Sequence, residues 1–250
     1  MGVLIVLPPS EGKASEGSGP PVVQLSFPSL DKPRKRVQTA LVRASKRRDA
    51  LGVLGLTPGL AAELAKNTAL TTAATLPAAD LYTGVLYDNL GLNTLDPDAR
   101  SRAAESVVIF SGLWGVVRID DRIPPYRLSM GVNLPPLGGL AAFWRPQIAK
   151  ALDRIPGLVV DLRSATYAAA WQPGERSVTV RVFRDGKVVS HMAKATRGEI
   201  ARALLQLDAA PAAPDELAKT LDALGYTVAL TAPSRANRPW TLDVHVTDPS

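Results

Sequence analysis

Cysteine is absent from the 250-residue chain, and histidine occurs only twice, as His191 and His245. The missing cysteine excludes disulfides, thiolate metal sites and cysteine nucleophiles. Two histidines are too few for a three-histidine zinc site, so any metal would need mostly carboxylate ligands. No pair of carboxylates stands out at helical spacing. We therefore predict no metal and no cofactor, and we expect no direct storage of iron.

Long apolar runs are missing as well. No stretch approaches the roughly 20 apolar residues of a membrane span. The opening residues 1–7 carry no basic segment, and their apolar run stops at Pro8 and Pro9, so no signal peptide is recognised. We expect a cytoplasmic protein that does not contact a membrane. Hydrophobic residues make up 46% and charged residues 21%, which is typical of a folded chain with a sizeable core.

Positive charge is concentrated at one end. Residues 1–48 contain nine Lys or Arg and three acidic residues, so this segment carries the whole net charge of +6. Such an imbalance favours a polyanionic partner, most often nucleic acid. The alternative is an ordinary solvated basic surface.

Apolar patterning predicts mixed helices and strands. Buried strands are expected at residues 3–7, 107–110 and 158–162, and a hairpin around Asp185-Gly186 with strands at 178–183 and 188–192. Helices are expected at about 31–49, after Pro58-Gly59, and at 140–152, 197–207 and from Asp215. On the helix at 31–49, Arg34 is placed away from the apolar face. We predict one α+β domain over residues 1–250, built on a mixed β-sheet with flanking helices.

Two loop regions have the composition of an anion site. Ser10, Gly12 and Lys13 follow the first strand, where open sheets bind ligands. A turn with an exposed lysine is the alternative. Arg118 and Arg127 lie in the loops after the strand at 107–110, and guanidinium groups in such loops are typical of phosphate or carboxylate sites. A buried pair of an arginine with Asp120 or Asp161 is equally compatible.

The segment from Leu51 to Ala61 has the form of a helical hairpin that follows basic residues. A helix-hairpin-helix element offers backbone N–H groups to DNA phosphates. Here Thr57 stands where the second glycine of the hairpin is usual, and a plain helical hairpin is the alternative.

A third basic group lies at 191–198, where Lys194 and Arg197 are expected near the start of a helix. His191 is more typical of a structural than a catalytic histidine.

Several of these segments together resemble the YaaA family of peroxide stress proteins. The resemblance rests on residues 110–118, 125–131 and 143–144, on 82–85, on 160–162 with Ser164 and Tyr167, and on Lys194 with Arg197-Gly198. These blocks occur in the family's order over most of the chain.

The resemblance implies a cytoplasmic bacterial protein that promotes survival of hydrogen peroxide by limiting free iron and oxidative DNA damage. It implies an α+β fold with a basic cleft, a helix-hairpin-helix element and binding of double-stranded DNA. Carried over, the element spans about residues 34–66 with its hairpin at Gly55 to Gly59, and the cleft falls on Lys13, Arg118, Arg127, Lys194 and Arg197. The opening loop departs from the family pattern, as do Trp114 and Ala195.

Two functions follow as hypotheses. The first is largely sequence-independent DNA binding, for which the candidate residues are Lys35, Arg36, Arg43, Lys46, Arg47, Arg48, Gly55 and Gly59. The second is an enzyme that acts on an anionic small molecule, with Lys13, Lys194 and Tyr126 as candidate catalytic residues. Its anion-binding candidates are Ser10, Lys13, Tyr82, Ser111, Arg118, Arg127, Lys194 and Arg197. The oligomeric state is left open.

Overall fold

The computed structural model describes residues 2–184, 187–188 and 190–246, and the side chains from 184 to 191 are outside the description. Its centre is a mixed sheet with strand order β11-β12-β9-β8-β1-β3-β4, and β10 pairs with β9. The chain is therefore α+β and built on a mixed sheet, as predicted. No helix in the described ranges is both long and apolar enough to cross a membrane.

Five neighbouring strands of this sheet run parallel. They are β1 (Leu4–Leu7), β3 (Val107–Ser111), β8 (Val159–Asp161), β9 (Ser177–Arg184) and β12 (Trp240–His245). All four residues of β1 are buried, because β1 lies between β3 and β8 with helices over the sheet. This position explains its uniformly apolar sequence.

The remaining strands are short or lie at the sheet margins. Antiparallel partners of the parallel strands are β4 (Gly115–Val117), β10 (Lys187–Val188) and β11 (Thr227–Thr231). Two small separate pairs are β2 (Leu76–Pro77) with β5 (Arg122–Ile123), and β6 (Asn133–Leu134) with β7 (Gly138–Gly139).

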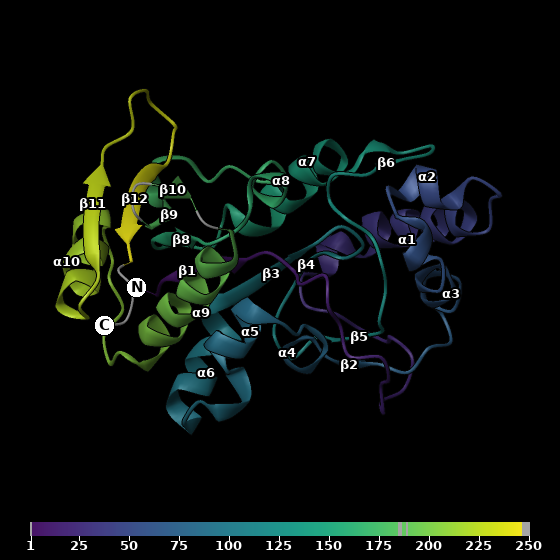
Figure 1. The fold of residues 1–250 in the computed structure, drawn as a ribbon, viewed down its shortest axis with the longest axis horizontal. Coiled ribbons are helices and arrows are strands. Elements are labelled where there is room, and N and C mark those ends of the chain that lie inside the picture. Colours follow the sequence, from purple (N-terminus) through teal and green to yellow (C-terminus); the bar gives the residue numbers. More distant parts are fainter. Residues whose placement is uncertain (1, 185–186, 189, 247–250) are drawn as a thin grey trace.

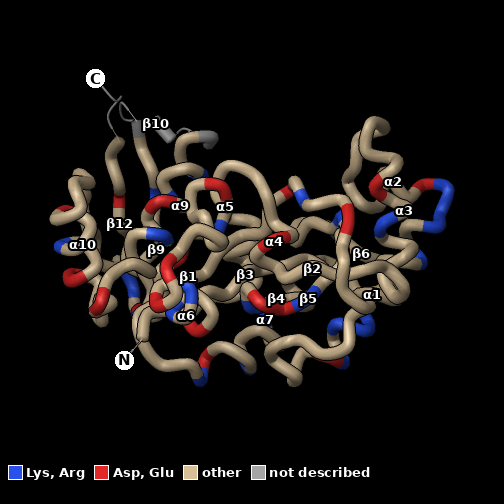
Figure 2. The backbone as a smooth tube through the Cα atoms, turned by 90° about the horizontal axis from the view of Figure 1, so that it is seen from below, with Lys and Arg blue, Asp and Glu red and all other residues tan. Residues whose placement is uncertain are grey.

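Helices lie on both sides of the sheet. In Figure 1, α9 and α5 lie on one side of strands β1 and β3, and α7 lies on the other, and Figure 2 shows the same order. The helices around the sheet are α4 (Ala78–Leu81), α5 (Val85–Leu90), α6 (Pro97–Ser106), α7 (Leu140–Leu152), α8 (Ala165–Ala168), α9 (Ser190–Gln206) and α10 (Pro214–Ala223).

Gly198 sets the distance between α9 and α5. A Cβ atom at this position would lie 2.2 Å from the carbonyl oxygen of Leu86 on α5, which is closer than atoms approach without a shift. The two helices therefore pack backbone to backbone, which only glycine permits.

A helical lobe projects from the β4 end of the molecule. It consists of α1 (Asp31–Ser45), α2 (Ala50–Leu54) and α3 (Glu63–Thr68), and a 3-10 turn at Pro58–Leu60 lies between α2 and α3. Further 3-10 turns lie at Pro28–Leu30, Leu92–Thr94 and Gly174–Arg176. We call α1, α2 and α3 with their connections the helical lobe.

Arg34 corrects one expectation for this lobe. The sequence pattern predicts a position away from the apolar face of its helix, yet its side chain is 3% exposed. Its guanidinium donates to the carbonyl oxygens of Trp114 (3.0 Å), Val116 (2.8 Å) and Ser26 (2.7 Å) and pairs with Asp31. The buried guanidinium is tolerated because nearly every N–H has an acceptor.

The hairpin and the helix that follows it also differ from expectation. The second strand, predicted to continue to Met192, is confined to Lys187–Val188, and α9 begins at Ser190 instead of near Arg197. Lys194 and Arg197 thus lie inside α9. The predicted turn at Asp185-Gly186 and the side chain of His191 lie outside the described residues.

Candidate functional site

The main pocket lies where the direction of the chain reverses across the sheet. From β1 the chain passes to β3 on one side, whereas from β8 it passes to β9 on the other side. The loops after β1 and β8 therefore separate at their carboxyl ends and leave a crevice, which is the usual ligand position in parallel sheets.

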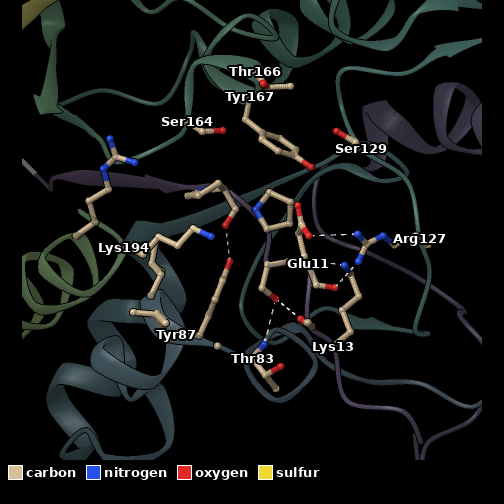
Figure 3. A pocket seen from close by; sticks show the side chains of 18 of the residues that line it. Glu11, Lys13, Thr83, Tyr87, Arg127, Ser129, Ser164, Thr166, Tyr167 and Lys194 are labelled. Carbon is tan, nitrogen blue, oxygen red and sulfur yellow. Dashed lines mark hydrogen bonds and ion pairs between the residues drawn. The ribbon is translucent and has the colours of Figure 1, made fainter. Parts of the chain in front are cut away.

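We call this crevice the carboxyl-edge pocket. Its volume is about 550 Å³, enough for a small metabolite or a single nucleotide. It is lined by residues from five segments of the chain: Pro8 to Lys13 after β1, Thr83 to Tyr87 at α5, Arg127 to Ser129, Ser164 with Thr166 and Tyr167, and Lys194 with Arg197 on α9. Figure 3 shows these side chains converging on one space.

Lys13 is the most chemically distinctive residue of the pocket. Its Nζ donates to the carbonyl oxygen of Ser10 at 2.7 Å and lies 4.7 Å from the ring centroid of Tyr126 and 5.5 Å from that of Tyr82. Burial lowers the pKa of Lys13 to about 7, assisted by the nearby charge of Arg127. Lys66 adds to this effect, whereas Glu63 and Glu11 oppose it. A sizeable fraction of this amine is therefore neutral at physiological pH.

A layer of hydroxyl groups lies beneath Lys13. The Tyr126 hydroxyl is 2.6 Å from Ser111 Oγ and 2.9 Å from the Tyr82 hydroxyl, and all three side chains are buried. Ser111 Oγ also accepts from the backbone N–H groups of Leu113 and Trp114. Because those two bonds occupy its acceptor positions, Ser111 donates to Tyr126, and Tyr126 in turn donates to Tyr82. Burial raises the pKa of both tyrosines, so they keep their protons.

Arg127 forms the wall next to Lys13. Its guanidinium donates to the Glu11 carbonyl oxygen at 3.1 Å and to the Glu11 carboxylate at 3.2 Å. The Glu11 side chain is 87% exposed, so this pairing is weak. The backbone of Arg127 is held by Asn67 of α3, which donates to its carbonyl oxygen at 2.9 Å and accepts from its N–H at 2.8 Å.

The opposite wall supplies two further cations from α9. Lys194 is exposed and directed into the pocket (Figure 3). Arg197 is partly buried, its Nε has no hydrogen-bond partner within the part of the chain that the structure describes, and its Nη2 reaches the Val180 carbonyl oxygen at 3.5 Å. Burial lowers the pKa of Arg197, and Asp161 partly offsets this effect.

Asp161 itself is committed to another arginine. It forms a bidentate pair with Arg163, with Nε–Oδ1 and Nη2–Oδ2 distances of 2.8 and 2.6 Å, and both side chains are buried. The Arg163 guanidinium also lies 4.2 Å from the Phe110 ring centroid. This pair fixes the backbone at the end of β8 from which Ser164 and Tyr167 reach the pocket.

The structure brings together five of the candidate anion-binding residues, which are Ser10, Lys13, Arg127, Lys194 and Arg197. Tyr82 and Ser111, with Tyr126, lie in the hydroxyl layer behind Lys13 and do not line the pocket. Arg118 lies elsewhere: its guanidinium donates to the Glu105 and Val107 carbonyl oxygens. The two carboxylates named as alternative partners for Arg118 or Arg127 pair with other arginines, Asp120 with Arg100 and Asp161 with Arg163.

Sequence reasoning missed Glu11, Ser129 and Asn67. Nothing in the local sequence indicates that Glu11 meets Arg127, which is 116 residues away. Asn67 is fully buried in the helical lobe, where an asparagine in a short helix gives no signal of a distant partner.

The candidate DNA-binding side chains gather on the helical lobe. Lys35, Arg36, Arg43, Lys46, Arg47 and Arg48 are all exposed. Arg47 pairs with Asp49 at 2.7 Å, and Arg36 lies 5.1 Å from the Phe143 ring centroid. Figure 2 shows blue segments at the end of the molecule that carries α1, α2 and α3.

The segment predicted as a helix-hairpin-helix element has a simpler local structure. Gly55 has a left-handed backbone conformation (φ 64°) and ends α2. Its N–H donates to the Gly52 carbonyl oxygen, and the N–H of Leu56 donates to the Leu51 carbonyl oxygen. Gly59 lies in a 3-10 turn without a positive φ. Both glycines are exposed and have open space around them. DNA binding by this hairpin remains a prediction.

Fold and pocket together define an α+β protein whose parallel strands present a cation-lined pocket at their carboxyl edge. Residues 3–231 match the family model described as peroxide stress protein YaaA, so the chain belongs to that family. It is 53% identical to the UPF0246 protein SCO2297 of Streptomyces coelicolor, over 98% of each chain. It is 43% identical to the UPF0246 protein CE1889 of Corynebacterium efficiens, over 90% of this chain and 94% of that one.

Proposed function

We propose that this peroxide stress protein acts in the cytoplasm by binding double-stranded DNA, largely without sequence preference, through the basic surface of the helical lobe. One observation carries the proposal. Six cationic side chains lie exposed between Lys35 and Arg48, and in the described residues only Arg47 among them has an ion-pair partner. Unpaired exposed cations are the groups that neutralise phosphates.

The same surface supports a role in limiting iron-dependent damage. Cationic side chains that neutralise phosphates release the cations condensed on DNA, and ferrous ions would be among them. Less iron on the duplex means fewer hydroxyl radicals formed beside it when hydrogen peroxide is present. The proposal therefore needs no iron site in the protein, and no three His, Asp or Glu side chains gather into one among the described residues.

A charge-removal variant tests DNA binding. Arg43, Lys46 and Arg48 are replaced together by Gln, because these three have no ion-pair partner among the described residues. Affinity for a labelled duplex is measured by fluorescence anisotropy over a range of salt concentrations. Each lost phosphate contact lowers the slope of log affinity against log salt by about 0.9, so the triple variant should lose about 2 to 3 in slope.

A matched control separates local contacts from net charge. Arg154, Arg235 and Arg238 are exposed arginines far from the helical lobe in the sequence, and replacing them by Gln removes the same charge. The control should keep most of the affinity. Equal losses in the two triple variants, or wild-type affinity that hardly changes with salt, would refute the proposal. Nicking of a plasmid by ferrous iron and peroxide, with each variant present, tests the protective role.

A second candidate function is supported by the carboxyl-edge pocket. Lys13, with a pKa lowered to about 7 by burial, faces a space that also holds Arg127, Lys194 and Arg197. DNA wrapping along the helical lobe needs no such pocket, whereas an enzyme that acts on an anionic small molecule does. Isothermal titration with small phosphate esters tests this candidate, because an empty structural crevice would bind none of them.

A further inference from the structure

The amine of Lys13 is positioned as a reactive group rather than as half of an ion pair. Its Nζ donates to one uncharged acceptor, the Ser10 carbonyl oxygen, and lies over the faces of two tyrosine rings. Among the residues that the structure describes, no carboxylate is paired with it. The positive charge of Arg127 disfavours the protonated form of Lys13. An amine held in this way has a free lone pair for part of the time.

The pocket also holds cations with little neutralisation by carboxylates among the described residues. Lys194 and Arg197 enter from α9, and Arg127 enters from the other side with only the exposed Glu11 as partner. The Arg197 Nε is buried without an acceptor in the described part of the chain. Three cations on two walls match a phosphate group better than a single carboxylate, because a phosphate carries more charge and more acceptor oxygens.

We propose that Lys13 forms an imine with a small phosphate-bearing aldehyde or ketone, whose phosphate is held by Lys194, Arg197 and Arg127 in the carboxyl-edge pocket. This inference rests on the small-molecule function proposed above for the same pocket, and it adds the reactive group of the ligand. The volume of about 550 Å³ leaves room for a sugar-phosphate or a ring of similar size.

Formation of the imine needs only Lys13 and the carbonyl compound. The Nζ lone pair of neutral Lys13 forms a bond to the carbonyl carbon, and the carbonyl oxygen leaves as water with the two amine hydrogens. The imine nitrogen then takes up one proton. The resulting cation withdraws electrons from the neighbouring carbon atom, which is the catalytic use of such lysines. Tyr82 and Tyr126 keep their protons below the amine, so they do not compete with it as bases.

Reductive trapping tests the proposal with three related probes. Pyridoxal phosphate carries both an aldehyde and a phosphate, pyridoxal lacks the phosphate, and pyridoxine phosphate lacks the aldehyde. The wild-type protein is incubated with each aldehyde and cyanoborohydride near pH 7, which reduces an imine to a stable amine, and modified lysines are mapped by peptide mass spectrometry. Binding of pyridoxine phosphate is measured separately by calorimetry.

We expect the phosphate-bearing aldehyde to modify Lys13 at least about tenfold more than any other lysine, since an ordinary lysine is almost fully protonated at this pH. Pyridoxal should modify Lys13 much less, and excess pyridoxine phosphate should protect it. Lys13→Arg keeps the positive charge and should abolish this modification, whereas Lys150→Arg, an exposed position on α7, should not. If Lys13→Arg does not fold, the wild-type peptide map decides alone.

The contrary outcomes separate failure of the imine from failure of the anion pocket. Modification spread over the exposed lysines, or unchanged when the phosphate is removed, overturns the imine. Binding of pyridoxine phosphate without any trapping at Lys13 also overturns the imine but leaves the anion pocket standing. Absence of both binding and trapping removes the imine and the small-molecule function together.

Discussion

The buried amine of Lys13 predicts a specific dependence of stability on pH. In the folded protein its pKa is lowered from 10.5 to about 7, mainly by burial and secondly by Arg127. Below pH 7 both the folded and the unfolded chain hold the proton, and the full cost of burying the charge is present. Between pH 7 and 10.5 the unfolded chain binds more protons at this site, so the free energy of unfolding rises with pH.

The size of the effect on the free energy of unfolding follows from how far the pKa of Lys13 is lowered. A pKa lowered from 10.5 to about 7 corresponds to a penalty of about 5 kcal/mol below pH 7, of which about 2 to 3 kcal/mol is relieved between pH 6 and pH 9. Replacing Lys13 by Met keeps much of the side-chain volume and removes the charge. We expect Lys13→Met to be more stable than wild type at pH 6, and this advantage to shrink by about 2 to 3 kcal/mol at pH 9.

The assay is urea unfolding at pH 6, 7, 8 and 9, followed by tryptophan fluorescence, because Trp114, Trp144 and Trp171 are buried. Taking the difference between variant and wild type cancels the titration of groups common to both. Lys150→Met is the matched control, and its difference from wild type should stay constant. A Lys13→Met difference that is also constant across this range would refute the reasoning, since the amine would then titrate alike in both states.

Two substitutions, each with a control, test the packing that positions the site. Gly198→Ala should lower the free energy of unfolding by about 2 to 4 kcal/mol and lower the melting temperature, because its Cβ would collide with the Leu86 carbonyl oxygen. The control Gly52→Ala, in open space on α2, should raise the free energy of unfolding by about 0.5 to 1 kcal/mol. Similar effects of the two substitutions would contradict the close approach of α9 and α5. Asp161→Asn should lower the free energy of unfolding by about 3 to 5 kcal/mol, because it leaves the buried Arg163 without its carboxylate. The control Asp243→Asn breaks the half-exposed pair with Arg181 and should lower the free energy of unfolding by less than about 1 kcal/mol in the same urea assay. Equal costs would show that the Asp161–Arg163 pair is not desolvated.

The elements that follow from local sequence were predictable. The run at residues 4–7 is a central strand because only a strand buried on both faces needs such a sequence, and the helix predicted at 140–152 is α7. The start of α9 was not predictable from alternation. Val188, Ser190 and Met192 alternate like a strand, but only Val188 lies in one, whereas Ser190 and Met192 lie in the first turn of α9, which packs against α5.

The site was only partly predictable, for a similar reason. Lys13 could be placed after a strand, and strand ends are where ligands bind. The other residues that line its pocket include 127, 167, 194 and 197, and only the strand order brings them together. Arg34 shows the opposite limit: its spacing from Val37 and Leu41 lies on the buried face, but a charge hides the pattern until its acceptor carbonyls are known.

The amide of Asn67 has a consequence for how the two candidate functions are connected. It forms two hydrogen bonds with the backbone N–H and carbonyl oxygen of Arg127, as a neighbouring strand would. These bonds connect α3 of the helical lobe directly to one wall of the carboxyl-edge pocket. A shift of α3 under a bound duplex would carry Arg127 with it. Duplex and pocket ligand would then change each other's affinity by the same factor, since such coupling is reciprocal.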